Sequence, residues 1–409
     1  MHILWLNSNL LLPLDKGGKL RTWHLMRHLA AHHEITYVSF ADLSATAADR
    51  DGMREVCSRL EVVARSDHQK GTLSFYAGAA GRLLDPLPYA AGKYRSPAYR
   101  SVVDRLLATG KFDLVVCDFL VPAVNMPRRL PCPAVLFTHN VEAEIWRRHH
   151  ERQPDPVRRL LFRQQWRRML RFEASTIARF DLVLAVSDAD RETLQRLYAP
   201  QLKAPIVTVA TGVDTAFFAP RPSAVTDSRH LVFTGSMDWI PNEDAMKHFC
   251  QDVLPLIRLE EPEVTLSIVG RAPTPAVQRL ASLPGVTVTG GVDDVREHIA
   301  RAGVYVVPIR IGGGTRLKIF EAMAMGKAVV STTVGAEGLP VSDGRDVVIA
   351  DHPAEFTAAV VSLMRHPARR VQLERAARQL VLDRYDWSAV AGQLEEALMK
   401  AASLAAAAA

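Results

Sequence analysis

An alternation of short apolar runs with helix-like stretches extends along nearly the whole chain and constrains its fold more than any other feature. Strand-length runs lie at 2–6, 35–40, 60–64, 114–117, 134–138 and 182–186. A second series lies at 231–234, 265–269, 286–289, 304–307, 328–331 and 347–350. Strands that alternate with helices in this way form parallel sheets covered on both faces. The sequence therefore predicts an α/β protein with two doubly wound, Rossmann-like sheets.

The two series are separated by a stretch of different character. Residues 200–230 contain four prolines and read as a linker between domains. A chain of 409 residues is also too long for one ordinary core. We expect one domain over 1–200, a second over 201–385, and a final helix over 386–409 whose alanine tail is frayed.

Composition removes several classes of protein. The chain is 48% hydrophobic and 23% charged, which is typical of a folded domain rather than a disordered one. No apolar run approaches the ~20 residues of a membrane span, and the start of the chain lacks the pattern of a signal peptide. Four widely spaced cysteines favour neither a disulfide framework nor a zinc site, so we expect a cytoplasmic protein.

The most informative segment follows the strand at 304–307. The glycine triplet 312–314 permits close approach of a ligand to the backbone, Thr315 is a good helix N-cap, and helical spacing begins at Arg316. A helix N-terminus attracts anions, and Arg316 and Lys318 in its first turn favour a phosphate there. Glu321 is placed to accept hydrogen bonds from ribose hydroxyls. The alternative is a glycine loop before an exposed basic helix.

This segment resembles the donor site of the family 4 retaining glycosyltransferases. Further matches are Gly326–Ser331, Gly335–Leu339, Val269–Gly270, Gly290–Val292 and Tyr385–Trp387. The resemblance covers most of the chain and implies the GT-B fold, two Rossmann-like domains facing across a cleft that holds a nucleotide sugar. It also implies that the final helix crosses back onto the first domain, that configuration is retained, and that no metal or other cofactor is needed.

The resemblance assigns roles residue by residue. His139, after the strand at 134–138, would hydrogen-bond the donor sugar near the reacting carbon and, with Glu321, form the catalytic set. The remaining donor contacts would be Gly17, Gly18, Gly235, Gly313, Gly314, Thr315, Arg316 and Lys318. The alternative for the loop at 17–18 is an ordinary strand–helix turn, and for His139 a structural histidine.

The chain departs from the family pattern in two places. Many members carry Glu-x7-Glu, but Gly313 stands eight residues before Glu321. Relatives also place Arg and Lys near the donor diphosphate where this chain has Met237 and Asn242. We expect Arg316 and Lys318 to supply that positive charge, as in a Gly-Gly-Gly-Thr-Arg-x-Lys-x-x-Glu subgroup often associated with exopolysaccharide genes.

The pair Asp188 and Asp190 resembles the D-x-D motif that binds manganese in another glycosyltransferase fold. Ser187 precedes them at a helix start, where an N-cap followed by acidic residues explains the pattern without a metal. No other cluster has metal-ligand spacing. A G-x-G-x-x-G motif, which would indicate an oxidoreductase, is absent.

The net charge of +6 is concentrated in one segment, because residues 147–173 hold nine arginines and three acids. A helix predicted from Pro156 to Glu173 places apolar residues on one arc: Leu161, Phe162, Trp166, Met169 and Phe172. Most arginines share the other arc, and these are membrane-contact candidates: Arg159, Arg163, Arg167, Arg168 and Arg171. The two interpretations are a surface helix packed on the first domain and attachment to an anionic bilayer. No nucleic-acid-binding motif accompanies the arginines.

We therefore expect a glycosyltransferase that moves a sugar from a nucleotide-sugar donor to a glycan or lipid-linked acceptor. Its setting would be cell-surface or exopolysaccharide synthesis, in the cytoplasm or at the inner face of the plasma membrane. Two alternatives remain. Gly313 in place of glutamate would also fit a catalytically silent nucleotide-sugar-binding subunit, and the same fold would serve a sugar-nucleotide epimerase.

Overall fold

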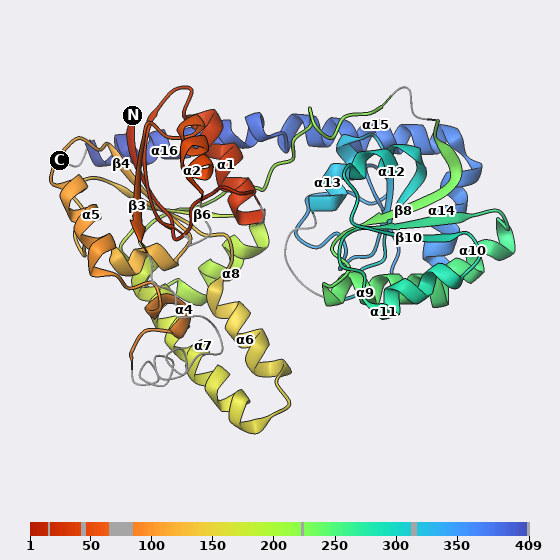
Figure 1. Cartoon of the computed structure of the whole chain (residues 1–409), viewed down its shortest axis with the longest axis horizontal. Coiled ribbons are helices and arrows are strands. Elements are labelled where there is room, and N and C mark those ends of the chain that lie inside the picture. The colour runs from red at the N-terminus through yellow and green to blue at the C-terminus, as the bar shows by residue number, and fades with distance from the viewer. Residues whose placement is uncertain (15–16, 42–45, 65–84, 222–224, 312–316, 407–409) are drawn as a thin grey trace. The chain divides into compact units, whose positions relative to one another are not determined.

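The computed structural model describes residues 1–14, 17–41, 46–64, 85–221, 225–311 and 317–406. It separates into two compact units, coloured along the chain in Figure 1. Unit 1 comprises Met1–Ala210 and Val390–Ala409, and unit 2 comprises Thr211–Ala389. The end of the chain thus belongs to the same unit as its beginning.

Unit 1 is built on a seven-stranded sheet in the order β3-β2-β1-β4-β5-β6-β7. All neighbouring strands are parallel. The strands are β1 (His2–Leu6), β2 (Glu34–Ala41), β3 (Arg59–Ala64), β4 (Leu114–Asp118), β5 (Ala134–Phe137), β6 (Leu182–Ala185) and β7 (Ile206–Thr208). The central strands β4 and β5 are buried at every position, as expected for a parallel sheet with both faces covered.

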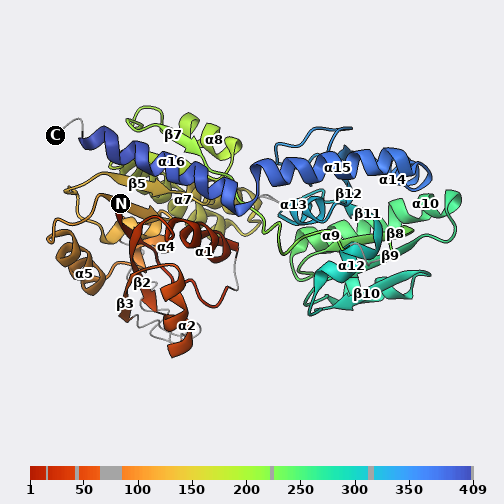
Figure 2. The ribbon, with the colours of Figure 1, turned by 90° about the horizontal axis from the view of Figure 1, so that it is seen from above.

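Helices flank this sheet and close its core. They are α1 (Gly17–Leu29), α2 (Ala47–Gly52), η1 (Met53–Glu55), α4 (Tyr89–Gly92), α5 (Pro97–Leu107), η3 (Val121–Asn125), α6 (Glu142–Arg152), α7 (Pro156–Ile177) and α8 (Asp188–Tyr198). The last helix is α16 (Trp387–Ala406), drawn in blue in Figure 2, and its residues from Val390 onward belong to unit 1. Within unit 1, Glu395 Oε1 lies 2.9 Å from His33 Nε2.

Unit 2 repeats the architecture with six parallel strands in the order β10-β9-β8-β11-β12-β13. The strands are β8 (Asp227–Thr234), β9 (Thr265–Val269), β10 (Val286–Gly290), β11 (Ala302–Val307), β12 (Ala328–Ser331) and β13 (Val348–Ile349). The helices are α9 (Ile240–His248), η4 (Phe249–Val253), α10 (Leu254–Glu260), α11 (Pro275–Gln278), η5 (Arg279–Ser282), α12 (Val295–Arg301), α13 (Leu317–Ala324), α14 (Pro353–Arg365) and α15 (Pro367–Arg384).

In each unit the strand order reverses once, between β1 and β4 in unit 1 and between β8 and β11 in unit 2. The carboxyl ends of these strands form the topological switch point, where open α/β sheets bind ligands. The fold therefore indicates one switch point in each unit as the place to look for functional side chains.

The predicted fold class, two doubly wound α/β units, is confirmed. The strands at 2–6, 265–269 and 328–331 have their predicted limits. One prediction was wrong: β7 lies inside the stretch interpreted as linker, because three residues after Pro205 give too short an apolar run to recognise. In the described part of the chain, no helix is both long and apolar enough to cross a lipid bilayer.

Candidate functional site

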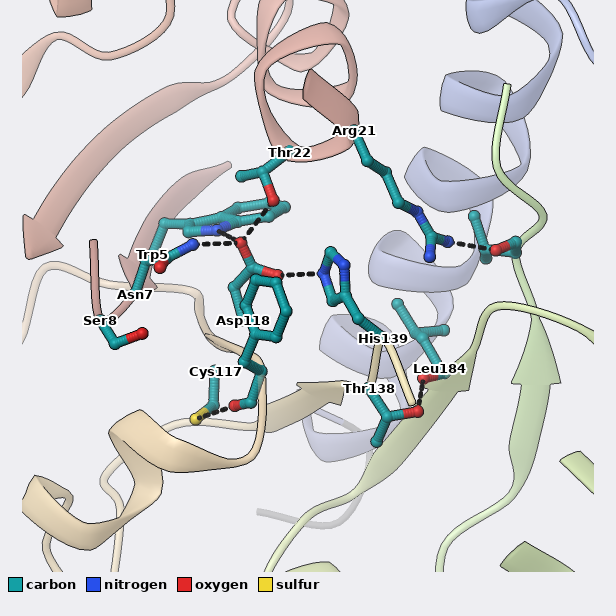
Figure 3. A network of polar contacts seen from close by, with 12 residues as sticks. Trp5, Asn7, Ser8, Arg21, Thr22, Cys117, Asp118, Thr138, His139 and Leu184 are labelled. Atoms are coloured by element: carbon teal, nitrogen blue, oxygen red, sulfur yellow. Dashed lines mark hydrogen bonds and ion pairs between the residues drawn. The ribbon is translucent and has the colours of Figure 1, made fainter. Parts of the chain in front are cut away.

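The switch point of unit 1 is organised around the carboxylate of Asp118, the last residue of β4. Asp118 is fully buried. Its Oδ2 accepts hydrogen bonds from Trp5 Nε1 at 3.1 Å, Asn7 Nδ2 at 2.6 Å and Thr22 Oγ1 at 2.7 Å. Its Oδ1 lies 2.7 Å from His139 Nε2 (Figure 3). A buried charge is tolerated when it is this fully hydrogen-bonded, so the five side chains form one rigid cluster.

His139, the predicted catalytic residue, is fixed in this cluster from two sides. An ionised Asp118 only accepts hydrogen bonds, so the Nε2–H of His139 donates to it and the neutral ring keeps its lone pair on Nδ1. The ring also stacks on Phe119, with centroids 3.7 Å apart and planes 14° apart. Burial lowers the pKa of His139, and the Asp118 carboxylate opposes that shift.

The two glycines at the start of α1 have different surroundings. A Cβ on Gly18 would lie 2.7 Å from Cζ of Phe119, whereas a Cβ on Gly17 would meet nothing within 4 Å. Phe119 itself has a φ of 70°, a conformation that costs a bulky residue about 1 kcal/mol or more. Gly18 therefore lets α1 approach the ring that supports His139.

Arg21 is a buried cation that the sequence pattern did not reveal. It lies on α1, donates to the carbonyl of Val209 and, at 3.4 Å, to that of Ala210. Its guanidinium lies 4.4 Å from the ring centroid of Phe137. Burial lowers its pKa to about 9, against the attraction of Asp118. Its Nε and Nη1 atoms are buried without a hydrogen-bond partner in the described residues.

The switch point of unit 2 depends on close backbone approach. Gly235 follows β8 and donates through its N–H to the carbonyl of Val269 at 2.9 Å. Gly270 follows β9 with a φ of 152°, and a Cβ there would lie 1.8 Å from the carbonyl oxygen of Gly235. Only glycine fits this contact between two strand ends.

Lys318 lies directly against this glycine corner. Its Nζ donates to Asn242 Oδ1 at 2.9 Å and stands 4.1 Å from the ring centroid of Phe233. A Cβ on Gly235 would lie 2.6 Å from that same Nζ. The positive charge of Lys318 therefore lies beside both Gly235 and Asn242.

Glu321 lies one turn after Lys318 on α13 and is half-buried. Burial raises the pKa of its carboxyl to about 7, and Lys318 opposes this shift. Among the described residues, no hydrogen bond reaches the Glu321 carboxylate. Four further predicted donor residues lie outside the described residues: Gly313, Gly314, Thr315 and Arg316.

The Asp188–Asp190 pair is a helix start, as the sequence predicted. Ser187 caps α8 by accepting from the backbone N–H of Asp190 at 3.1 Å and donates to the Asp190 carboxylate at 2.8 Å. Within the ranges that the structure describes, no group of three or more histidine, cysteine or acidic side chains has the arrangement of a metal site.

The cationic segment forms a helical hairpin of α6 and α7 that projects from the body of unit 1 (Figure 1). Met169 and Phe172 are buried, as predicted, but Leu161 is 43% exposed. The packing of the apolar arc on unit 1 therefore ends before Leu161, because helical spacing gives the direction of a side chain but not the point where the hairpin leaves the core. The predicted basic face is real: Arg159, Arg163, Arg167 and Arg171 are exposed, and Arg168 is half-buried.

The base of the hairpin is held by Glu173. From the sequence, this residue counted only among the acids of the segment and had no predicted structural role. Its buried carboxylate accepts from the backbone N–H groups of Glu142 and Ala143 at 3.0 Å and from the hydroxyl of Tyr198 at 2.6 Å. Burial raises its pKa to about 7. The carboxylate thus caps the first turn of α6, and no local pattern could have indicated a partner 31 residues away.

Comparison with known proteins agrees with this construction. Two parallel, doubly wound α/β units make up the GT-B fold. A sequence model described as Glycosyltransferase Family 4 matches residues 16–217, and one described as Glycosyl transferases group 1 matches residues 228–366. The chain belongs to the family 4 glycosyltransferases and is a transferase enzyme.

Curated relatives and solved structures fit the same assignment. A phosphatidyl-myo-inositol mannosyltransferase of Mycolicibacterium smegmatis is 27% identical over 84% of this chain and 85% of its own. A D-inositol 3-phosphate glycosyltransferase of Kineococcus radiotolerans is 25% identical over 58% of this chain and 59% of its own.

Two solved structures share the fold over 98% of this chain and 100% of theirs. Sucrose-phosphate synthase of Thermosynechococcus elongatus has a TM-score of 0.66 at 15% identity. HepE of Anabaena, crystallised in complex with UDP, has a TM-score of 0.65 at 16% identity.

Proposed function

We propose that this glycosyltransferase takes a sugar from a nucleotide-sugar donor and transfers it to a glycan or lipid-linked acceptor with retention of configuration. The observation that carries the proposal is the ammonium group of Lys318 held against the Gly235 corner of unit 2. A cation beside half-buried glycine backbone at a switch point suits a diphosphate. HepE of Anabaena, which shares the fold, was crystallised with UDP-glucose, and that makes such a donor the first to test.

In this proposal each switch point has its own task. Lys318, with Arg316 and the start of α13, binds the diphosphate and stabilises it as it leaves, in the electrostatic role that a metal ion takes elsewhere. Glu321 accepts hydrogen bonds from ribose hydroxyls. Gly17 and Gly18 let the backbone approach the donor from unit 1, and His139 binds the sugar near the reacting carbon.

Asp118 positions His139 in this scheme. With Nε2–H committed to Asp118, the Nδ1 atom is the acceptor that the ring offers to a sugar hydroxyl. The lowered pKa keeps the ring neutral, so this lone pair is present at neutral pH. The sugar is transferred to the acceptor on the same face that the diphosphate leaves, within an ion pair, so the configuration at the reacting carbon is retained.

A membrane-borne acceptor in exopolysaccharide or other cell-surface synthesis suits the α6–α7 hairpin. Its tip exposes apolar side chains beside the arginines, with Val157 at 68% and Leu160 at 65% exposure. Apolar residues rimmed by cations are what an amphipathic segment needs to lie in an anionic bilayer surface, where each basic residue contributes ~1 kcal/mol. The hairpin would then hold the enzyme at the inner face of the plasma membrane.

The donor site is tested by thermal shift with a panel of nucleotide sugars, on the wild type, Lys318→Met and Lys247→Met. Lys247 is an exposed lysine of the same unit and serves as the matched control. We expect one donor class to raise Tm in the wild type and the control and to lose most of that effect in Lys318→Met. Equal stabilisation of all three proteins would overturn the assignment.

Product analysis separates transfer from the two alternatives. A silent subunit would bind the donor and release no nucleoside diphosphate with any acceptor, as the departure at Gly313 allows. An epimerase would convert the donor to its epimer without an acceptor. We expect acceptor-dependent release of the nucleoside diphosphate and a product with the donor's anomeric configuration.

Flotation on liposomes tests membrane contact. Arg163→Glu with Arg167→Glu reverses two exposed charges of the hairpin, and Arg196→Glu with Lys203→Glu reverses two exposed charges elsewhere in unit 1. We expect salt-sensitive flotation of the wild type and the second pair on anionic vesicles, and none of the first pair. No flotation of the wild type at low salt would remove the membrane role.

A further inference from the structure

A second cationic feature of unit 1 shares no residue with the Asp118 cluster. A cavity of ≈ 610 Å³ lies between the start of α5, the loop after η3 and the C-terminal part of α7. Four arginines line it: Arg95, Arg100, Arg128 and Arg179. Four guanidinium groups around one cavity repel one another, so the arrangement needs compensating negative charge.

The described carboxylates of unit 1 supply only part of that charge. Asp85 pairs with Arg95 at 3.3 Å, and Asp104 pairs with Arg100 at 2.7 Å. Among the described residues, neither Arg128 nor Arg179 forms an ion pair with a carboxylate. The cavity wall therefore carries two positive charges that no carboxylate of the described residues neutralises.

Backbone carbonyls hold two of these cations close together. Arg179 Nη2 donates to the carbonyls of Pro127 at 2.7 Å and Met126 at 3.3 Å. Arg100 Nη1 donates to the same Met126 carbonyl at 2.9 Å. Two guanidinium groups thus share one oxygen atom, and their positions are fixed before any ligand arrives. Such preorganised donors bind an anion without the entropy cost of ordering long side chains.

Arg179 is the most constrained of the four. Burial lowers its pKa, and the charges of Arg100 and Arg128 lower it further. Its Nε atom is buried and has no hydrogen-bond partner in the described residues. Holding the loop after η3 in place explains the hydrogen bonds of the Arg179 Nη atoms. It does not explain why two more arginines line the same cavity. An anion in the cavity would account both for the buried Nε atom of Arg179 and for the additional arginines.

We infer that this cavity, which we call the arginine pocket, binds a phosphate ester. It is separate from the proposed diphosphate site beside Lys318 and Gly235 in unit 2. Paired guanidinium groups match the oxygen geometry of phosphate, and Ser175 and Thr176 on the wall add hydroxyl groups. Leu87, Val124 and Phe172 form an apolar part of the wall, which suits a ligand that carries the phosphate on a carbon skeleton. The phosphate belongs to a soluble ester or to a lipid headgroup.

The test is isothermal titration with inorganic pyrophosphate on the wild type, Arg128→Glu, Lys318→Met and the double variant, together with two further single variants described below. Arg128 is exposed and outside the loop clamp, so its replacement leaves the fold intact. Arg129→Glu is the matched control, since Arg129 is an exposed neighbour that does not line the pocket. We expect Arg128→Glu to remove one of two binding events, with affinity at that site at least tenfold weaker, and Arg129→Glu to remove neither.

The design separates this proposal from the proposed function. If Lys318→Met leaves both pyrophosphate-binding events intact, the proposed diphosphate site beside Lys318 is wrong, and the proposal for the arginine pocket is unaffected. If Arg128→Glu and a second variant, Arg100→Gln, both bind like Arg129→Glu, the arginine pocket is refuted whatever Lys318→Met does.

Vesicles then distinguish the two sources of phosphate. Phosphatidic acid carries a phosphate monoester, and phosphatidylglycerol vesicles of equal charge are the comparison. A preference for phosphatidic acid that Arg128→Glu abolishes and Arg129→Glu retains assigns the pocket to a lipid headgroup. Loss of pyrophosphate binding without any such preference assigns it to a soluble ester.

Discussion

The switch points of the two units occupy equivalent places in their sheets but are built by opposite means. In unit 1 side chains from β1, the segment after it, α1 and the loop after β5 converge on one buried carboxylate, Asp118 at the end of β4. In unit 2 the strand ends are joined by backbone contact between Gly235 and Gly270, with Lys318 laid against them. The switch point of unit 1 is fixed by side-chain hydrogen bonds, whereas that of unit 2 depends on two glycines, which have no side chains.

The difference has a chemical consequence. A carboxylate that already accepts four hydrogen bonds orients a neighbour and has little capacity left to bind a ligand itself, so unit 1 presents His139 in one defined state. Half-buried glycine backbone beside a lysine brings positive charge to the switch point, so unit 2 is suited to an anionic ligand. Substitutions at the switch point of unit 1 should therefore change the orientation of His139 and the stability of the unit. Substitutions at the switch point of unit 2 should change the packing of the two glycines and the affinity for the donor.

The largest effect is expected for Asp118→Ala. It leaves four buried donors without their acceptor, and breaking a buried charged cluster costs on the order of 3–5 kcal/mol of unfolding free energy. Urea unfolding measures the loss, and sugar transfer should fall with it because His139 is released. Asp51→Ala is the control, since that carboxylate is 70% exposed and its removal changes little. Equal stability of the two variants would show that the cluster does not hold unit 1 together.

A smaller effect of a different kind is expected for Gly270→Ala in unit 2. The added Cβ would overlap the Gly235 carbonyl oxygen, a backbone atom that cannot swing away, so we expect a loss of roughly 2–3 kcal/mol. Gly291→Ala is the control, because its Cβ would meet Arg271 at an ordinary 3.8 Å. If both substitutions were tolerated alike, the contact between the two strand ends would be unimportant for stability.

Most of the fold could be predicted from the sequence because a buried parallel strand is recognised from its own short apolar run. The apolar runs at 265–269 and 328–331 need no knowledge of the rest of the chain to be recognised. The sequence also indicated His139 and Lys318, since one follows a strand and the other begins a helix. A strand of three residues such as β7 carries too little local signal, and it was missed.

The parts that could not be predicted depend on contacts between distant segments. Asp118 reads as the polar end of a strand, and only the folded chain brings Trp5 and Thr22 to it, from 113 and 96 residues away. Arg21 reads as an ordinary helix arginine and is almost completely buried. The sequence could supply the chemistry of each side chain but not the convergence that makes a site.

Gly18→Ala should have an intermediate effect, on function more than on folding. Its Cβ would press on Cζ of Phe119, and a ring shift there disturbs the stack on His139, at roughly 1–2 kcal/mol. Gly17→Ala, one residue earlier, adds a Cβ that meets no protein atom within 4 Å, so it leaves the stack intact and should act only on the approach of the donor, by raising KM. We expect kcat to fall in Gly18→Ala alone. A fall in both variants would mean that the loop acts through its flexibility and not through Phe119.

The smallest effect is expected at Glu321, and it is a pH dependence. The pKa of this carboxyl is raised to about 7 by burial, so it ionises as the pH passes through neutrality. The ionised form accepts stronger hydrogen bonds from hydroxyls, so affinity for the donor found by thermal shift should rise a few-fold between about pH 6 and about pH 8. Binding favours the ionised form and therefore releases a proton in this window, which calorimetry in buffers of different ionisation enthalpy detects.

Glu321→Gln keeps the shape of the side chain and removes its titration. Its affinity for the donor should stay flat over the same range, near the low-pH value of the wild type. A nucleotide sugar is the suitable probe because its diphosphate, esterified at both ends, does not itself titrate near neutrality. A wild type as flat as the variant would place the ribose away from Glu321, and the raised pKa would then reflect only the packing of α13.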